Sequence, residues 1–338
     1  MSVIALFLTA YLVARIAVFA GMQLGLVDLP DARKIHTGKI PLTGGISIFI
    51  TILLGEAIFG VPPYTTEMMI IAGVVFLVGV FDDFRHMNPL LRLAIQYGAG
   101  VLLATYGGIA IHNVGNLLAM GDIPLLFMTI PLTALSVAGL ANAYNMIDGI
   151  DGLAAATIAL PLLCLYALAI NAEHPDAQFL LLMLVPIAVF LIFNLGPNNR
   201  LLPKAFLGDG GSVTLGFLVT ASLVYFSQGD NAVIAPVTAL WFVTVPLMDM
   251  LATMLRRYRA GRPIMEADQS HLHHALMDMG LSPRQTLAVT VAYAAVAAMT
   301  GLSLEAIPAY ASLVIYFLLF CLHCLFVITS SRESRQPT

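Results

Sequence analysis

Apolar residues form long runs along this chain, and short polar segments separate the runs. Most runs approach the roughly 20 residues that an α-helix needs to cross a bilayer. The pattern predicts about eleven membrane-spanning helices, and therefore an all-α polytopic integral membrane protein. The predicted spans are residues 2–24, 43–60, 67–81, 90–106, 125–144, 153–171, 178–194, 211–227, 233–255, 285–303 and 308–328.

The polar segments are too short to hold a soluble domain. The sequence therefore predicts one membrane-embedded domain over residues 1–338. The first apolar run lacks a preceding basic segment and a small-residue cleavage site, so we expect a retained span and not a removable signal peptide. The outer loop over residues 106–124 carries several Gly and Asn residues, which favour a short hairpin there.

Basic residues are confined to alternate loops, apart from Arg15 inside the first span. Loops after even-numbered spans hold no lysine or arginine. Basic residues accumulate on the cytoplasmic side of membrane proteins, so the odd-numbered loops and the C-terminus are predicted to be cytoplasmic and the N-terminus to lie outside. These basic residues are Arg33, Lys34, Lys39, Arg85, Arg92, Arg200, Lys204, Arg256, Arg257, Arg259, Arg262, Arg284, Arg332 and Arg335.

Composition agrees with a membrane protein. The chain is 59% hydrophobic and 10% charged, with a formal net charge of −4, and it has no basic patch typical of nucleic-acid binding. Its three cysteines all fall in predicted spans. The run from Cys321 to Cys324 (CLHC) has no further ligands nearby, so we do not expect a metal site there.

The richest polar segment follows the fifth predicted span, over residues 142–153 (NAYNMIDGIDGL). Asn142 and Asn145 offer both donors and acceptors, as the reading of a nucleobase or sugar edge requires. Asp148 and Asp151 add two carboxylates beside glycines that let the backbone approach a ligand closely. We interpret this segment as a substrate site.

Two further carboxylate groups indicate a divalent metal. Asp82 and Asp83 are adjacent after the third span, and adjacent carboxylates at a membrane interface need a compensating cation. Asp209 follows a glycine at the start of the eighth span, where the N–H of Gly210 suits a phosphate. Mg²⁺ prefers a few hard oxygen ligands together with substrate phosphates. Asp209, Asp82 and Asp83 are the predicted metal ligands.

Cations and histidines make up the remaining candidates. Arg262 precedes His271, His273 and His274, and these side chains suit a phosphate or sugar better than zinc, because no cysteines or paired carboxylates accompany them. Lys34 and His36 in the first cytoplasmic loop are predicted to hold an anionic group. A buried carboxylate, Asp249, lies inside the ninth span, and its role stays open between structure and catalysis.

All these clusters fall in odd-numbered loops and therefore on one membrane face. Such a set of residues suits metal-assisted phosphoryl transfer with a lipid as one substrate. One alternative is a transporter for an anionic sugar or nucleotide, which would place its polar residues near the middle of the bilayer. Another is a CDP-alcohol phosphotransferase, whose carboxylates lie in one compact run.

The motifs resemble the polyprenyl-phosphate N-acetylhexosamine-1-phosphate transferase superfamily, a group of glycosyltransferase family 4 type. The resemblance extends over about residues 28–290, and the histidine segment is similar to the WecA type more than to the MraY type. It implies a bacterial inner-membrane enzyme with a periplasmic N-terminus and a cytoplasmic active site. The motifs that carry it are Asp82-Asp83, the segment 142–153, Gly208-Asp209-Gly210, the loop 33–45 and His271-Leu-His273-His274.

The resemblance implies a reaction and its partners. The enzyme would transfer a sugar 1-phosphate from a UDP-sugar to undecaprenyl phosphate and release UMP, as the first step of a cell-surface glycan such as an O-antigen. GlcNAc is the expected sugar, with another 2-acetamido sugar as the alternative. Mg²⁺ is the expected cofactor, with Mn²⁺ as a substitute, and a homodimer stays open.

The resemblance also suggests roles for residues. Asp209 would bind the metal, with Asp82 and Asp83 at the catalytic centre, and the histidines would line the diphosphate. One proposal for the family makes Asp82 a general base toward the lipid phosphate. A phosphate monoester has a second pKa near 6 and is mostly dianionic at neutral pH, so we favour a metal-binding or orienting role for Asp82 and Asp83.

Overall fold

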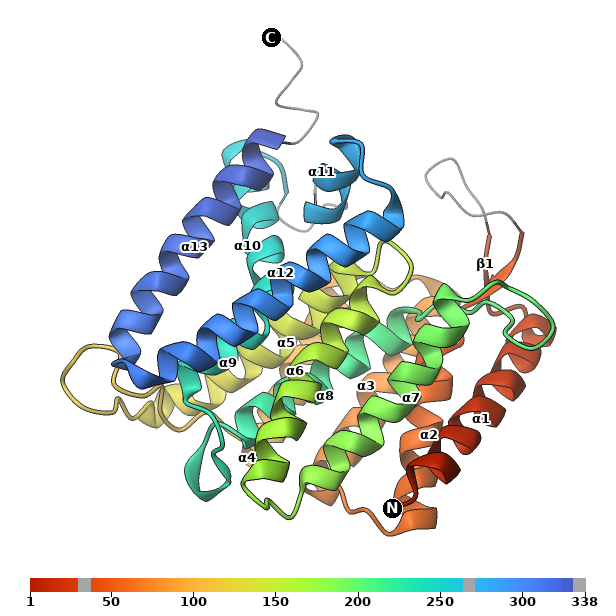
Figure 1. Cartoon of the computed structure of the whole chain (residues 1–338), viewed down its shortest axis with the longest axis horizontal. Helices are drawn as coiled ribbons and strands as arrows, with labels where there is room; N and C mark the ends of the chain where they lie inside the picture. Colours follow the sequence, from red (N-terminus) through yellow and green to blue (C-terminus); the bar gives the residue numbers. More distant parts are fainter. Residues whose placement is uncertain (30–37, 264–270, 331–338) are drawn as a thin grey trace.

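A computed structural model describes residues 1–29, 38–263 and 271–330, and these residues fold mainly as helices (Figure 1). Two strands and three 3₁₀ turns accompany them: β1 (Val27–Asp28), β2 (Ile40–Pro41), η1 (Leu126–Met128), η2 (Gly229–Asn231) and η3 (Leu304–Ala306). The helices are α1 (Val3–Leu24), α2 (Gly44–Phe59), α3 (Thr66–Arg85), α4 (Pro89–Thr105), α5 (Thr129–Ile147), α6 (Leu153–Asn171), α7 (Ala177–Leu195), α8 (Asp209–Tyr225), α9 (Pro236–Phe242), α10 (Thr244–Arg259), α11 (Leu272–Asp278), α12 (Pro283–Ser303) and α13 (Ala309–Ser330).

Ten of the eleven predicted spans each coincide with one helix, which confirms the helical fold class. Within the described residues, six helices are long and apolar enough to cross a membrane, or seven if the bent pair α9 and α10 is one span. Helices α2 and α4 have 16 and 17 residues. At 1.5 Å per residue they are about 24–26 Å long, somewhat shorter than a hydrocarbon core of about 30 Å.

The ninth predicted span is not one straight helix. It is broken at Val243 into α9 and α10, which are bent by 77° relative to each other. Pro246 accounts for the position of the break, because proline has no N–H and its ring clashes with the carbonyl four residues earlier, at Phe242. The predicted span over residues 233–255 therefore consists of two helices and not of one continuous helix.

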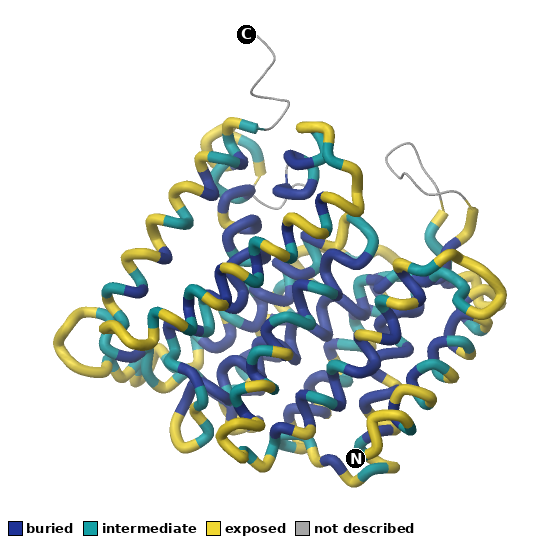
Figure 2. The backbone as a smooth tube through the Cα atoms, in the orientation of Figure 1, coloured by how far each residue is buried: buried dark blue, intermediate teal, exposed yellow. Residues whose placement is uncertain are grey.

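Helix α8 forms the centre of the bundle, and its residues from 210 to 224 are all buried. It packs against α2, α3, α5 and α6. Glycines allow the approach: a Cβ on Gly79 would lie 2.6 Å from Cα of Gly210, and one on Gly45 would lie 2.1 Å from Cα of Gly211. Small residues of this kind let helix backbones pack closely in membranes. In Figure 2 the buried residues accordingly line the inside of the bundle, and the exposed ones lie on its outside and in the loops.

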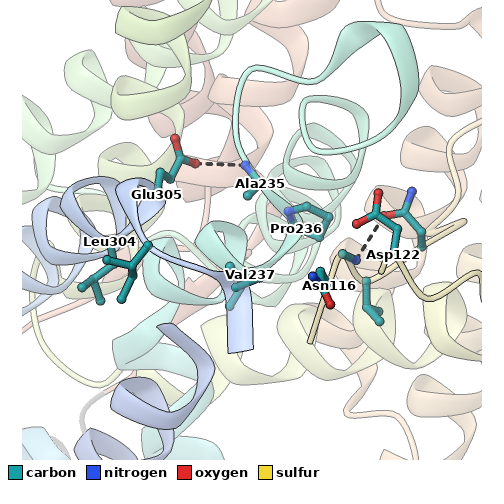
Figure 3. A pocket seen from close by; sticks show the side chains of 12 residues that line it. Asn116, Asp122, Ala235, Pro236, Val237, Leu304 and Glu305 are labelled. Carbon is teal, nitrogen blue, oxygen red and sulfur yellow. Dashed lines mark hydrogen bonds between the residues drawn. The ribbon is translucent and has the colours of Figure 1, made fainter. Parts of the chain in front are cut away.

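The two ends of the bundle differ. At one end, β1 pairs with β2 and Leu42 forms a bridge with Phe206. At the other end, an antiparallel bridge between Asn113 and Pro124 confirms the predicted hairpin. That end also holds a pocket of about 270 Å³, where Oε1 of Glu305 accepts the N–H of Ala235 at 2.9 Å (Figure 3).

Close helix packing gives a prediction for Gly216 in α8. A Cβ there would lie 2.8 Å from Cα of Ala141 in α5, and this backbone cannot move easily. We expect Gly216→Ala to lower the free energy of unfolding by about 1–3 kcal/mol through overpacking. Thermal unfolding of the detergent-solubilised protein measures the loss.

Gly73 in α3 provides the matched control. A Cβ at Gly73 would have no neighbour within 4 Å, and alanine favours a helix over glycine by roughly 0.5–1 kcal/mol. Gly73→Ala should therefore leave the melting temperature unchanged or raise it. Equal melting temperatures for the two variants would contradict the packing that we describe.

Candidate active site

The candidate site is built around the first turn of α8. Asp83, in the last turn of α3, accepts the N–H of Asp209 on Oδ1 at 2.8 Å and the N–H of Gly210 on Oδ2 at 3.0 Å. Gly208 precedes the helix with φ of 75°, and a Cβ there would lie 2.8 Å from the Asp83 carboxylate. The glycine therefore allows this carboxylate to cap α8 from a neighbouring helix.

Arg92 links two of the predicted catalytic carboxylates. Its Nη1 lies 2.7 Å from Oδ2 of Asp82 and 3.1 Å from Oδ2 of Asp209. Asp82 is buried and also accepts the N–H of Met87 at 2.6 Å. A charge-assisted contact of this kind holds both partners firmly when it is shielded from water. Arg92 thus connects the end of α3 to the start of α8 from its place on α4.

Asn145 contacts the other carboxylate oxygen of Asp209. Its Nδ2 donates to Oδ1 of Asp209 at 2.7 Å and to Oγ of Ser212 at 3.0 Å. Asp209 therefore contacts side chains from both α4 and α5. Asn142, a second predicted substrate residue, lies on α5 one turn before Asn145.

Asp148 follows the end of α5 and adds another carboxyl group. By surface area the residue is exposed, but the protein packed around it removes much of its water. This desolvation, with the charges of Asp209, Asp83 and Asp151, raises the pKa of Asp148 to about 8. Desolvation is the largest of these causes, and it disfavours the charged form of the carboxyl group.

Asp151 lies beside a second, smaller pocket. Its Oδ2 forms an ion pair with Lys204, whose Nζ also lies 5.6 Å from the ring centroid of Phe206. The pocket has a volume of about 90 Å³, and Asp151, Asn194, Lys204 and Arg284 contribute to its lining. Oδ1 of Asn194 is buried and has no hydrogen-bond partner among the described residues. An unpaired buried acceptor beside a pocket is a suitable group for binding a polar ligand.

The histidines approach the turn between α5 and α6 from the start of α11. The rings of His271 and His273 are parallel at 5.8 Å, and the His274 ring lies 4.2 Å from that of His273. A Cβ on Gly149 would lie 2.3 Å from Nε2 of His273, so this glycine allows the imidazole to reach the segment 142–153. Burial, with the neighbouring charge of His274, lowers the pKa of His273 to about 3 and keeps that ring neutral.

The start of α2 also reaches the site. Gly44 and Gly45 donate their N–H groups to the carbonyls of Phe206 and Leu207, both at 2.8 Å. Lys34 and His36 lie outside the described residues, so their predicted contacts stay predictions. Arg262 follows α10, where its N–H donates to the carbonyl of Arg257 at 2.9 Å.

The structure adds three residues that sequence reasoning did not select. Arg92 and Lys204 were assigned to topology, yet each forms an ion pair with a predicted site carboxylate. Asn194 had no motif to mark it, because it ends an apolar helix. The only sequence signal for the two cations was their location in odd-numbered loops beside the motifs.

The residues therefore collect negative charge at one end of the bundle. Five carboxyl groups, those of Asp82, Asp83, Asp148, Asp151 and Asp209, lie here, and among the described residues Arg92 and Lys204 form ion pairs with three of them. Such an excess of carboxylates suits the binding of a divalent cation together with substrate phosphates.

Comparisons with known proteins agree with this chemistry. The model of the family described as glycosyl transferase family 4 matches residues 65–227. The chain is similar to the undecaprenyl-phosphate alpha-N-acetylglucosaminyl 1-phosphate transferase of Escherichia coli (strain K12), with 33% identity over 89% of this chain and 83% of that protein.

Proteins with the same name in two other bacteria extend the likeness. The Salmonella typhi protein is 33% identical over 95% of this chain and 88% of its own length. The Haemophilus influenzae protein is 32% identical over 99% of this chain and 96% of its own length. On the strength of these matches and of the site that lies within them, this chain is a multi-pass membrane protein that belongs to glycosyl transferase family 4.

Proposed function

We propose that the protein transfers GlcNAc 1-phosphate from UDP-GlcNAc to undecaprenyl phosphate. An oxygen of the lipid phosphate attacks the phosphorus that carries the sugar, and the bond from that phosphorus to UMP breaks. The products are UMP and a polyprenyl diphosphate that bears the sugar. The observation that carries this proposal is the cluster at the start of α8, where Arg92 and Asn145 hold Asp209 beside Asp82 and Asp83.

The contacts of Asp82 support an orienting role over a basic one. Its carboxylate is buried and already accepts from Arg92 and from the Met87 N–H. The attacking phosphate is mostly dianionic at neutral pH, because its second pKa is near 6. Asp82 therefore has no proton that it must remove, and it keeps Arg92 in place beside Asp209.

The residues fit a Mg²⁺ ion held by few protein ligands. Asp209 is the expected ligand, with Asp82 and Asp83 beside it, since Mg²⁺ is commonly held by one or two carboxylates plus substrate phosphates. No preformed cluster of three such ligands occurs within the described ranges. When bound, the ion would offset the charge that develops on the departing phosphate.

The substrates would approach from different sides of the cluster. The pocket beside Asp151 is lined by Asn194 and Lys204 and has a volume of about 90 Å³, so it would hold one polar part of the nucleotide and not the whole of it. The neutral ring of His273 lies against Gly149 of the segment 142–153, which also holds Asn142 and Asp148, and we expect the sugar diphosphate to bind there. Gly210 donates its N–H to Asp83, and a phosphate contact of Gly210 stays a prediction.

Two other functions have weaker support. A transporter needs polar groups near the middle of the membrane with access from both sides, but here the carboxylates and histidines gather at one end of the helices. A CDP-alcohol phosphotransferase would carry its carboxylates in one compact run, whereas these come from α3, α8 and the turn between α5 and α6.

The topology that we propose follows from the basic loops. Residues 1–338 would form a single transferase domain in the bacterial inner membrane, with eleven crossings, a periplasmic N-terminus and a cytoplasmic C-terminus. Helices α9 and α10 would together make one bent crossing. The active site would then face the cytoplasm, where UDP-sugars are made.

The first test is a transfer assay. Purified protein is incubated with Mg²⁺, undecaprenyl phosphate and labelled UDP-GlcNAc, and we expect equal amounts of UMP and lipid-linked label. A panel of UDP-2-acetamido sugars identifies the preferred donor. Absence of product with every UDP-N-acetylhexosamine would contradict the proposed function.

Arg92→Gln tests the bridging cation. Removing the guanidinium leaves Asp82 and Asp209 without their shared partner, so we expect transfer to fall by about 10²–10³-fold, as when one stabilising donor is removed from an active site. Arg200→Gln is the control, because Arg200 is exposed in the loop before α8. A similar fall in both variants would show a general effect of charge and not a specific role of Arg92.

Metal dependence can be tested by binding as well as by rate. We expect EDTA to abolish transfer, and Mg²⁺ or Mn²⁺ to restore it. In electron paramagnetic resonance titrations with UDP-GlcNAc present, Asp209→Asn should weaken Mn²⁺ binding by at least about tenfold. Asp230→Asn, at the opposite end of α8, should bind Mn²⁺ as the wild type does.

Asp82→Asn separates orientation from base catalysis. If Asp82 orients Arg92, the variant loses activity and raised pH does not restore it, since the lipid phosphate is already deprotonated. The measurement is the pH profile of transfer at saturating Mg²⁺. Recovery at high pH with unchanged Mg²⁺ affinity would instead identify Asp82 as the base.

A further inference from the structure

Asp249 is a buried carboxylate whose role the proposed reaction does not explain. It lies in α10 with no exposed surface. Both of its oxygens accept hydrogen bonds from the start of the histidine segment: Oδ1 from the N–H of Leu272 at 2.7 Å, and Oδ2 from Nδ1 of His271 at 2.9 Å. A carboxylate buried in this way is costly unless its oxygens are satisfied, and here two partners satisfy it.

The contact with His271 decides which ring nitrogen carries a proton. An ionised carboxylate can only accept, so Nδ1 of His271 must be the donor. The other ring nitrogen, Nε2, then remains for a different partner, and the hydrogen bond at Nδ1 sets its protonation. The Thr253 hydroxyl also lies near Nδ1, but at the longer distance of 3.4 Å.

A comparison with His273 shows the effect of the Asp249 carboxylate on His271. His273 lies parallel to His271, yet its Nε2 is buried without a hydrogen-bond partner among the described residues. Among the described residues, no carboxylate forms a hydrogen bond with His273 that would select a tautomer. Of the two parallel rings, His271 is the one that a buried aspartate holds in a defined orientation and tautomer.

We propose that Asp249 is a positioning residue for sugar-phosphate transfer. It keeps a proton on Nδ1 of His271 and holds the start of α11 against α10, so that Nε2 of His271 meets the diphosphate of the nucleotide sugar. This inference rests on the proposed function, because the diphosphate that we assign as the partner of Nε2 belongs to the proposed substrate. It extends that function to a residue buried inside the bundle, on α10.

Asp249→Asn is the direct test. The asparagine side chain has nearly the same shape and can still accept from Leu272, but its amide nitrogen cannot accept from Nδ1 of His271. We expect kcat to fall by about 10–100-fold, the usual effect of removing a group that orients a functional histidine. KM for the UDP-sugar should change much less.

A double-mutant cycle shows whether Asp249 acts through His271. The pair Asp249→Asn with His271→Gln should be no slower than His271→Gln alone, because interacting residues are not additive. Multiplied effects would overturn the proposal. Asp176→Asn is the matched control: Asp176 accepts from Tyr225 at the other end of the bundle, so the same chemical change should leave transfer within about twofold of the wild type.

Nuclear magnetic resonance of protein labelled with ¹⁵N-histidine tests the positioning without any enzyme assay. The His271 signals are those missing from His271→Gln. In the wild type we expect a protonated Nδ1, and in a folded Asp249→Asn we expect that signature to be lost. A wild-type His271 with its proton on Nε2 alone would overturn the inference, even if Asp249→Asn cannot be purified.

The two hypotheses fail in different ways. A wild type that is inactive with every UDP-sugar contradicts the proposed function, while the ¹⁵N spectra still decide whether Asp249 holds the Nδ1 proton. An active wild type whose Asp249→Asn variant keeps its full kcat contradicts the inference alone.

Discussion

The arrangement of this site depends on one interaction, the capping of α8 by Asp83 of α3. The first N–H groups of a buried helix have no partner within the helix, and leaving them unpaired inside a bundle is costly. A carboxylate there also interacts favourably with the positive end of the helix. The capping hydrogen bonds and this charge interaction together contribute about 0.5–2 kcal/mol. Because Asp83 fills this position, its neighbour Asp82 is directed toward Arg92, and Asp209 is held where Arg92 and Asn145 both reach it.

Glycines let α8 lie close enough to α3 for Asp83 to cap it. Gly210 and Gly211 lie against Gly79 of α3 and Gly45 of α2, at distances that admit no Cβ. The glycines after Asp209 therefore serve helix packing, and the N–H of Gly210 binds a carboxylate of the protein itself. The sequence interpretation, in which these glycines open the backbone to a phosphate, could not separate the two uses, because both require the same residue.

Apolar run lengths predicted the helices well, and the alternation of basic loops placed the motifs at one end. The break between α9 and α10 was missed, although Pro246 was visible, because prolines inside α6 and α7 are tolerated without such a break. Arg92, Lys204 and the Asp249 contact could not be predicted from local pattern. Each depends on a partner far away in sequence, and only the packed bundle brings the partners together.

Charge balance constrains how the proposed substrates can bind. Arg92 and Lys204 already contact carboxylates, and the pKa of Asp148 is raised to about 8 by desolvation and by the charges of Asp209, Asp83 and Asp151, so the site already holds closely spaced negative charge. A lipid phosphate and a nucleotide diphosphate would each add to it, and like charges repel strongly in a site with little water. The positive charge must therefore be supplied when the substrates bind, which is the physical reason to expect a divalent ion to enter with the diphosphate. His273 lies beside the segment 142–153 but is neutral, so it does not relieve this repulsion.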